Sequence, residues 1–212
     1  MEKVLIFGIK LINMTMNKDI SRKTILKFLS SISSEKEIRK YIERFSSDDY
    51  KFAIVKAGGL ILKEEVQHLV ASIGFLYEIG LKPIIVHGAG PQINEALKKS
   101  KIKPSFINGQ RITDANTLKI VISELHKANE NLGNELHKSD VKAYSCLTDI
   151  FKCHIKDKNL GLVGEIYETN DNKIKSLIRD NYVPVISPLG LCKNQTLNIN
   201  ADSAANACLL YT

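Results

Sequence analysis

The residues of this chain that are suited to chemistry gather where two apolar segments end. Residues 55–59 (VKAGG) and 86–94 (VHGAGPQIN) each run from apolar side chains into closely spaced glycines. Glycine allows a positive φ angle and lets a ligand approach the backbone closely. Pro91 suits the first position of a helix, and the free N–H groups at a helix start favour an anion. The pattern indicates an anion site at residues 88–90, although tight packing also explains each glycine turn taken alone.

Lys56 strengthens this interpretation, because it lies in the first apolar segment beside Gly58 and Gly59. A buried ammonium group is costly without an anionic partner. In open parallel sheets, ligands bind beyond the carboxyl ends of the strands. Two glycine turns that follow consecutive strands therefore favour an anion site over tight packing alone.

An alternation of strands and helices is predicted to position these residues. Strands are expected at 51–59, 82–90, 142–149, 151–157, 160–169 and 182–190. Helices are expected at 64–80, 91–100, 113–138, 172–181 and from 200 onward. We expect Thr113 to cap the longest helix, and 151–157 and 160–169 to form a hairpin. Nearly continuous apolar strands between helices indicate the α/β class, with a mainly parallel sheet sandwiched between helices.

Residues 1–48 are predicted to form a separate N-terminal helical segment, and residues 49–212 the main domain. Ser34 and Glu37 have the spacing of a capping box, and apolar residues then recur at helical spacing up to Phe45. Such a segment is expected to pack on the main domain, on a second subunit or on both. We therefore predict a homo-oligomer, a dimer or a tetramer.

Composition excludes several classes of protein. The chain has 44% hydrophobic and 25% charged residues, as soluble globular proteins do, and lacks an apolar run long enough for a membrane span. The net charge of +7 comes from scattered lysines without interleaved aromatics, which argues against nucleic acid and favours small phosphorylated or carboxylated partners. Four cysteines without metal-binding spacing indicate a reduced, cytoplasmic protein with no metal site of its own.

Four motifs together resemble the amino acid kinase family. Residues 55–59, 86–94, 108–111 (NGQR) and 197–205 (LNINADSAA) occur in the order, and at about the spacings, seen in that family. The resemblance is greatest to members that phosphorylate N-acetylglutamate. Residues 24–45 look like the helical segment of the kinase domain in bifunctional N-acetylglutamate kinase/synthase proteins. The resemblance covers nearly the whole chain from about Lys23 onward.

The resemblance implies the following catalytic and phosphate-binding residues. Lys56 matches the lysine that contacts the transferring phosphoryl group, and Asp202 the aspartate that orients the catalytic lysines. Gly58 and Gly59 match phosphate-binding positions. The phosphoryl donor implied is ATP, as Mg-ATP, acting in arginine biosynthesis. Asp202 is also explained as an acid that stabilises the start of a helix.

The substrate implied is N-acetyl-L-glutamate, whose γ-carboxylate accepts the phosphoryl group. Gly88, Ala89 and Gly90 match the turn whose N–H groups hold the substrate and the phosphoryl group. Arg111 matches the arginine that binds the α-carboxylate, and Asn198 the asparagine that contacts the acetylated amino acid. The predicted hairpin at residues 151–168 matches a lid over this substrate.

The family pattern also leaves questions open. The turn reads Gly-Ala-Gly where simpler kinases of the family have three glycines. We expect the family's remaining segment, which holds most of the nucleotide-binding part and a second catalytic lysine, to be missing after Thr212, as in a fragment, an incomplete gene model or a degenerate gene. The alternative function is a non-catalytic regulatory module that binds L-arginine. His87 is interpreted as structural, and Asn200 equally as a turn residue or a site residue.

Overall fold

The computed structural model of the protein describes residues 53–78 and 81–211. The predicted N-terminal helical segment, residues 1–48, and the predicted helix end at Gly80 lie outside the described residues.

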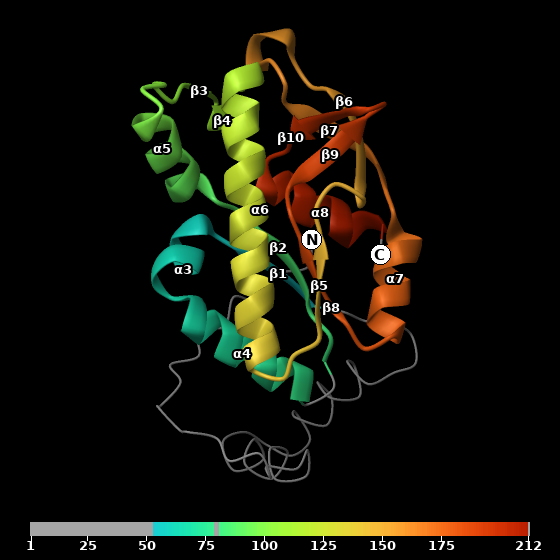
Figure 1. Ribbon diagram of the computed structural model, residues 1–212. Coiled ribbons are helices and arrows are strands. Elements are labelled where there is room, and N and C mark those ends of the chain that lie inside the picture. The colour runs from blue at the N-terminus through green and yellow to red at the C-terminus, as the bar shows by residue number, and fades with distance from the viewer. Residues whose placement is uncertain (1–52, 79–80, 212) are drawn as a thin grey trace. The chain divides into compact units, whose positions relative to one another are not determined.

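The centre of the main domain is a parallel sheet of four strands in the order β1-β2-β8-β5 (Figure 1). Strands β2 and β8 are buried along their whole length, as expected for inner strands covered on both faces. The bounds of the strands are β1 Ile54–Ala57, β2 Ile84–His87, β5 Ala143–Cys146 and β8 Val183–Ile186. The predicted mainly parallel sheet is confirmed.

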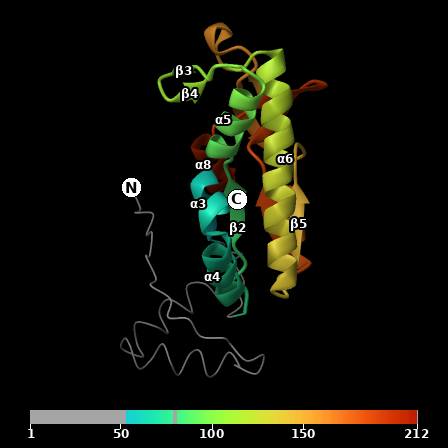
Figure 2. The same cartoon turned by 60° about the vertical axis from the view of Figure 1, so that its left-hand side comes forward.

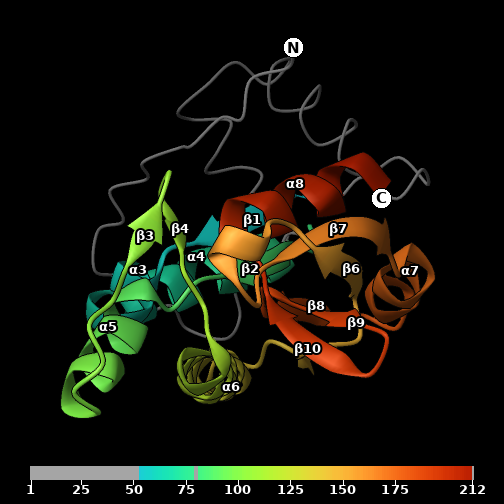
Figure 3. The ribbon, with the colours of Figure 1, turned by 90° about the horizontal axis from the view of Figure 1, so that it is seen from above.

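Helices cover both faces of this sheet, and alternating strand residues contact them. Ile85 and Val185 pack with α4 (Val66–Glu78) and α6 (Ala115–Lys138), whereas Ile84, Val86 and Ile186 pack with the helices of the other face. Those helices are α7 (Asp171–Arg179) and α8 (Ala201–Tyr211). Figure 3 shows α6 and α8 on opposite sides of the strands. The predicted αβα sandwich is therefore confirmed.

A second sheet of four strands follows the order β10-β9-β6-β7. Strands β6 (Phe151–Ile155) and β7 (Gly164–Thr169) are antiparallel and joined through the short helix η1 (Lys158–Leu160), so the predicted hairpin is confirmed. Strands β9 (Leu189–Cys192) and β10 (Gln195–Asn198) form a further hairpin that the sequence did not predict. Its two-residue turn contains Lys193 at a φ of 56° and no glycine, so the usual hairpin signal is missing.

The remaining elements are two helices, α3 and α5, and a short hairpin. The residues after β1 form helix α3 (Gly59–Glu64) where only a turn was predicted, and α5 (Gly90–Lys99) follows β2. Figure 2 shows α3 and α5 following one another along the same side of the molecule. A two-stranded hairpin consists of β3 (Phe106–Ile107) and β4 (Gln110–Arg111).

The prediction for the cap of the longest helix was wrong by one residue. The Asp114 carboxylate caps α6 by accepting a hydrogen bond from the Thr117 N–H at 2.7 Å. Thr113 is instead buried, and its hydroxyl donates to the Arg111 carbonyl at 3.0 Å. Both residue types are good caps, so only the backbone path decides between them.

Candidate functional site

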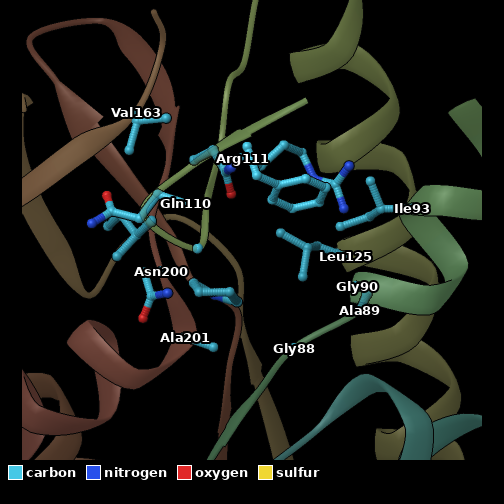
Figure 4. A pocket seen from close by; sticks show the side chains of 15 residues that line it. Gly88, Ala89, Gly90, Ile93, Gln110, Arg111, Leu125, Val163, Asn200 and Ala201 are labelled. Carbon is cyan, nitrogen blue, oxygen red and sulfur yellow. The ribbon is translucent and has the colours of Figure 1, made fainter. Parts of the chain in front are cut away.

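A pocket of about 170 Å³ lies beyond the carboxyl ends of β2 and β8, the edge at which open parallel sheets bind ligands (Figure 4). Its walls come from the turn before α5, from the β3–β4 hairpin, from α6 and from the start of α8. The lining residues are Gly88, Ala89, Gly90, Ile93, Phe106, Gly109, Gln110, Arg111, Leu125, Val163, Pro188, Asn198, Ile199, Asn200 and Ala201.

The two glycine segments of the sequence lie against each other at this edge. A Cβ atom on Gly59 would come within 2.8 Å of the Gly90 nitrogen and 2.9 Å of the Ala89 Cα, so the backbones are in direct contact. The Gln92 side chain amide also donates to the Gly59 carbonyl at 2.8 Å. Gly59 is therefore needed for close packing, whereas a Cβ on Gly58 or Gly90 would meet no atom within 4 Å.

Arg111 is the buried cation of the pocket. Its Nη2 donates to Asn94 Oδ1 at 2.6 Å, and its guanidinium lies over the Phe106 ring, with Cζ 4.8 Å from the ring centroid. Burial lowers the pKa of the Arg111 guanidinium, but an arginine starts so far above neutrality that it stays charged. Its Nη1 is buried without a hydrogen-bond partner. A buried cation with an unpaired donor favours an anionic ligand beside it.

The segment that enters α8 contributes two asparagines with different roles. Asn200 caps the helix, because its Oδ1 accepts from the Asp202 and Ser203 N–H groups at 2.9 and 3.0 Å. The Asn198 side chain donates to Thr113 Oγ1 at 3.2 Å and lies on the pocket wall. Asn198 thus ties the wall formed by β10 to the segment that carries Arg111.

Lys56 and Asp202 form an ion pair beside the pocket and do not line it. Lys56 Nζ lies 3.0 Å from Asp202 Oδ1, and the two side chains are 40% and 68% exposed. Their elements adjoin the pocket, because a Cβ on Gly88 would lie 3.7 Å from Ala201 Cβ and 3.8 Å from the Gly59 nitrogen. The expectation that Lys56 is buried at the strand end was wrong, since Lys56 is exposed near the C-terminal end of β1.

The structure therefore divides the predicted site residues into two groups. One group lines the pocket and consists of Gly88, Ala89, Gly90, Arg111 and Asn198. The other group lies where β1 enters α3 and α8 begins, and consists of Lys56, Gly58, Gly59 and Asp202. Sequence reasoning missed Asn94 and Phe106, which hold the Arg111 side chain, because neither residue type signals such a contact in advance.

Comparison with known proteins identifies the family. The sequence profile of the amino acid kinase family matches residues 51–208. The chain belongs to the amino acid kinase family. The pocket at the carboxyl ends of β2 and β8 is thus a pocket of an amino acid kinase domain, and the resemblance inferred from four motifs is confirmed.

Two relatives and one solved structure illustrate the similarity. The chain is 43% identical over 178 residues to an acetylglutamate kinase of Xylella fastidiosa (strain 9a5c), covering 82% of this chain and 42% of that protein. It is 37% identical over 188 residues to the mitochondrial protein arg-6 of Neurospora crassa, covering 87% of this chain and 22% of that protein. The crystal structure of smu.665 from Streptococcus mutans UA159 superposes with a TM-score of 0.70 at 26% identity, covering 74% and 66% of the two chains. The chain thus spans less than half the length of these two relatives.

Three further features of this amino acid kinase domain concern metal ligands, membrane-spanning helices and the cysteine thiols. Among residues 53–78 and 81–211, no three His, Cys, Asp or Glu side chains gather to hold a metal ion. No helix of that part of the chain is long and apolar enough to cross a membrane. Burial raises the pKa of the Cys146 and Cys208 thiols to about 12, so these side chains stay protonated and unreactive at neutral pH.

Proposed function

We propose that this chain is the substrate-binding part of an acetylglutamate kinase, which transfers the γ-phosphoryl group of ATP to the γ-carboxylate of N-acetyl-L-glutamate. The observation that carries the proposal is the unpaired Nη1 of buried Arg111 in a pocket that also contains the Gly88–Gly90 turn. The substrate has two carboxylates, and the pocket offers a guanidinium at one wall and helix-start N–H groups at another. The 43% identity to an acetylglutamate kinase supports the same choice.

In the proposed complex, Arg111 binds the α-carboxylate of the substrate and Asn198 contacts its acetylated amino group. The γ-carboxylate then faces the Gly88–Gly90 turn, whose Ala89 and Gly90 N–H groups stabilise the charge of the transferring phosphoryl group, while the Gly88 N–H donates to the Ala57 carbonyl. A planar guanidinium held by Asn94 and Phe106 keeps a fixed direction, which suits a carboxylate. Positioning and charge stabilisation are the main contributions that phosphoryl transfer requires from a protein.

Lys56 is assigned to the transferring phosphoryl group, and Asp202 to the orientation of Lys56. Their 3.0 Å ion pair supports this assignment, because it holds the ammonium group near the starts of α3 and α8. Gly58 and Gly59 place backbone N–H groups at the same edge. Each well-placed donor of this kind contributes on the order of 3 kcal/mol to transition-state stabilisation.

The phosphoryl donor in this proposal is ATP, which arrives as its magnesium complex. Mg²⁺ is expected to be carried by the nucleotide phosphates, as is common for this ion. We place the reaction in arginine biosynthesis and the protein in the cytoplasm.

The alternative is a regulatory module that binds L-arginine and transfers no phosphoryl group. The Lys56–Asp202 ion pair favours the kinase, because a module that only senses a ligand needs no cation beside two phosphate-binding turns. A ligand-binding experiment separates the two proposals.

Calorimetric titration of the chain with N-acetyl-L-glutamate, and in parallel with L-arginine, tests the proposal. Saturable binding of N-acetylglutamate that weakens at least about tenfold in Arg111→Lys supports it, because an ammonium cannot replace a bidentate guanidinium. Arg179→Lys, a change of the same type at an exposed position of α7, is the matched control and should bind as the wild type does. If the chain binds only L-arginine, the kinase proposal is rejected in favour of the regulatory module.

A further inference from the structure

A buried polar cluster lies next to residues that line the pocket and takes no part in the proposed reaction. It consists of His87, Asn129 and Ser187, which are at most 1% exposed, and we call it the His87 cluster. Asn129 Nδ2 lies 3.0 Å from both Ser187 Oγ and His87 Nε2, and 2.9 Å from the Val185 carbonyl oxygen. Ser187 Oγ lies 3.2 Å from His87 Nε2.

The Val185 carbonyl determines how these groups share their hydrogens. A carbonyl only accepts, so the nitrogen of the Asn129 amide must face it and donate. The second amide hydrogen then points towards Ser187 Oγ, and the serine hydroxyl is free to donate to His87 Nε2. The approach of the donating Asn129 amide thus favours Nε2 as an acceptor, which assigns the proton of the imidazole to Nδ1, an atom that is buried without a hydrogen-bond partner.

Each member of the cluster is close in sequence to a residue that lines the pocket. His87 ends β2 and precedes Gly88, while Ser187 follows β8 and precedes Pro188. Asn129 lies one helical turn after Leu125 on α6, and the two side chains therefore point from the same face. The cluster thus connects three segments that contribute to the pocket: the glycine turn, the segment after β8, and α6.

Asn129 is an unfavourable choice for packing alone. Its amide is fully buried in the middle of a helix, and its Oδ1 lies without a hydrogen-bond partner. An unpaired buried acceptor costs stability, so general packing does not explain the choice of residue. The contacts of the Asn129 amide with the Val185 carbonyl, Ser187 and His87 instead fix how α6 meets the ends of β2 and β8.

We propose that Asn129 is a positioning residue, which acts through His87 and Ser187 to hold the Gly88–Gly90 turn and the Pro188 segment in register with α6. The position of the turn relative to these segments determines whether its N–H groups point towards the ligand. The identity of that ligand rests on the proposed function, whereas the effect on the turn does not.

The test compares Asn129→Leu with Asn131→Leu, a control at an exposed position of the same helix. Backbone amide hydrogen exchange is measured by NMR at Gly88 and Ile93, whose N–H groups donate to the Ala57 and Ala89 carbonyls at 2.9 Å, together with the urea midpoint and the affinity for N-acetyl-L-glutamate. In Asn129→Leu we expect about tenfold faster exchange at these two amides and about tenfold weaker binding. The midpoint should also fall, because the Val185 carbonyl and His87 lose a buried donor. Asn131→Leu should match the wild type in exchange and affinity.

Wild-type exchange at Gly88 and Ile93 in a folded Asn129→Leu protein would overturn the proposal. Exchange that is faster to the same extent throughout the chain would also overturn it, since the residue would then be a purely structural one. If Asn129→Leu does not fold, Ser187→Ala decides, because it removes only one hydroxyl and should still speed exchange at the turn. If the wild type binds no N-acetylglutamate, the proposed function fails, and the exchange data still decide the role of Asn129.

Discussion

Two cations at this site, Arg111 and Lys56, have environments that suit different tasks. Arg111 is buried, stacked on Phe106 and bonded to Asn94, so its direction is fixed before a ligand binds. Lys56 is 40% exposed and paired with Asp202 on a flexible side chain. A fixed planar group suits recognition of a carboxylate, whereas a mobile point charge suits a group that moves during the reaction.

We predict that Lys56→Ala leaves the affinity for N-acetyl-L-glutamate within about twofold and the free energy of unfolding within about 1 kcal/mol, since exposed ion pairs contribute little. Phosphoryl transfer by the kinase, measured as ADP release, should fall at least about a hundredfold. Lys63→Ala is the matched control, because Lys63 is also 40% exposed and paired, with Glu95, outside the site. Equal losses of affinity and turnover in Lys56→Ala would contradict a role in the transition state.

The buried imidazole of His87 is expected to make the free energy of unfolding depend on pH. Burial lowers the pKa of His87 from 6.5 to about 4, while the Gly88 backbone acts in the opposite direction. The unfolded chain therefore binds a proton between pH 6.5 and 4 that the folded chain does not, and stability falls as the pH decreases through this window. The full loss is about 3 kcal/mol. Urea unfolding between pH 7 and pH 4 should show this fall, and His87→Gln should flatten it, whereas exposed His68→Gln should not.

At the scale of elements, the site depends on how closely α3 and α5 approach each other. A methyl group on Gly59 would meet backbone atoms of Gly90 and Ala89, which cannot move as a side chain can. We predict that Gly59→Ala lowers the free energy of unfolding by about 1–3 kcal/mol. In Gly74→Ala, a helix position where the added methyl meets only Val141 at 3.8 Å, stability should rise by about 0.5–1 kcal/mol. Equal stability of the two variants in urea unfolding would contradict the close approach.

The connection between β6 and β7 is held against the segment that follows Arg111. Thr113 N–H donates to the Leu160 carbonyl at 2.9 Å, and Leu162 N–H donates to the Thr113 carbonyl at 2.7 Å. Gly161 has a φ of 72°, and a Cβ there would meet the Thr113 oxygen at 2.5 Å. Val163 of this connection lines the pocket. These contacts support the hypothesis that the hairpin covers the substrate.

At the scale of the whole molecule, the predicted helical segment at residues 1–48 concerns assembly. Its capping box and apolar spacing favour packing on another surface. We predict that deletion of residues 1–47 lowers the oligomeric state without loss of the main-domain fold. Size-exclusion chromatography with light scattering measures the first quantity and circular dichroism the second. If the number of subunits per particle stays the same after the deletion, the segment does not contribute to the subunit interface.

Much of the fold and part of the site could be predicted from the sequence. Apolar periodicity indicated the strands and helices of the sandwich, because burial on two faces leaves a clear pattern. Gly58, Gly59, Gly88 and Gly90 after two consecutive strands indicated an anion site, and the resemblance to the amino acid kinase family added Arg111. The β9–β10 hairpin and the Asp114 cap could not be predicted, because their residue types also fit other local conformations.

Sequence alone predicted most of the strands and helices and a set of candidate anion-binding residues, since both depend on local patterns of apolar side chains and glycine. Tertiary structure alone decided which charges are buried: Arg111 lies inside with one unpaired nitrogen, and Lys56 outside with a partner. It also brought Asn129 to His87 and Ser187, residues 42 and 58 positions away. Burial and such long-range hydrogen bonds depend on how distant segments pack, and no local pattern of residues encodes that packing.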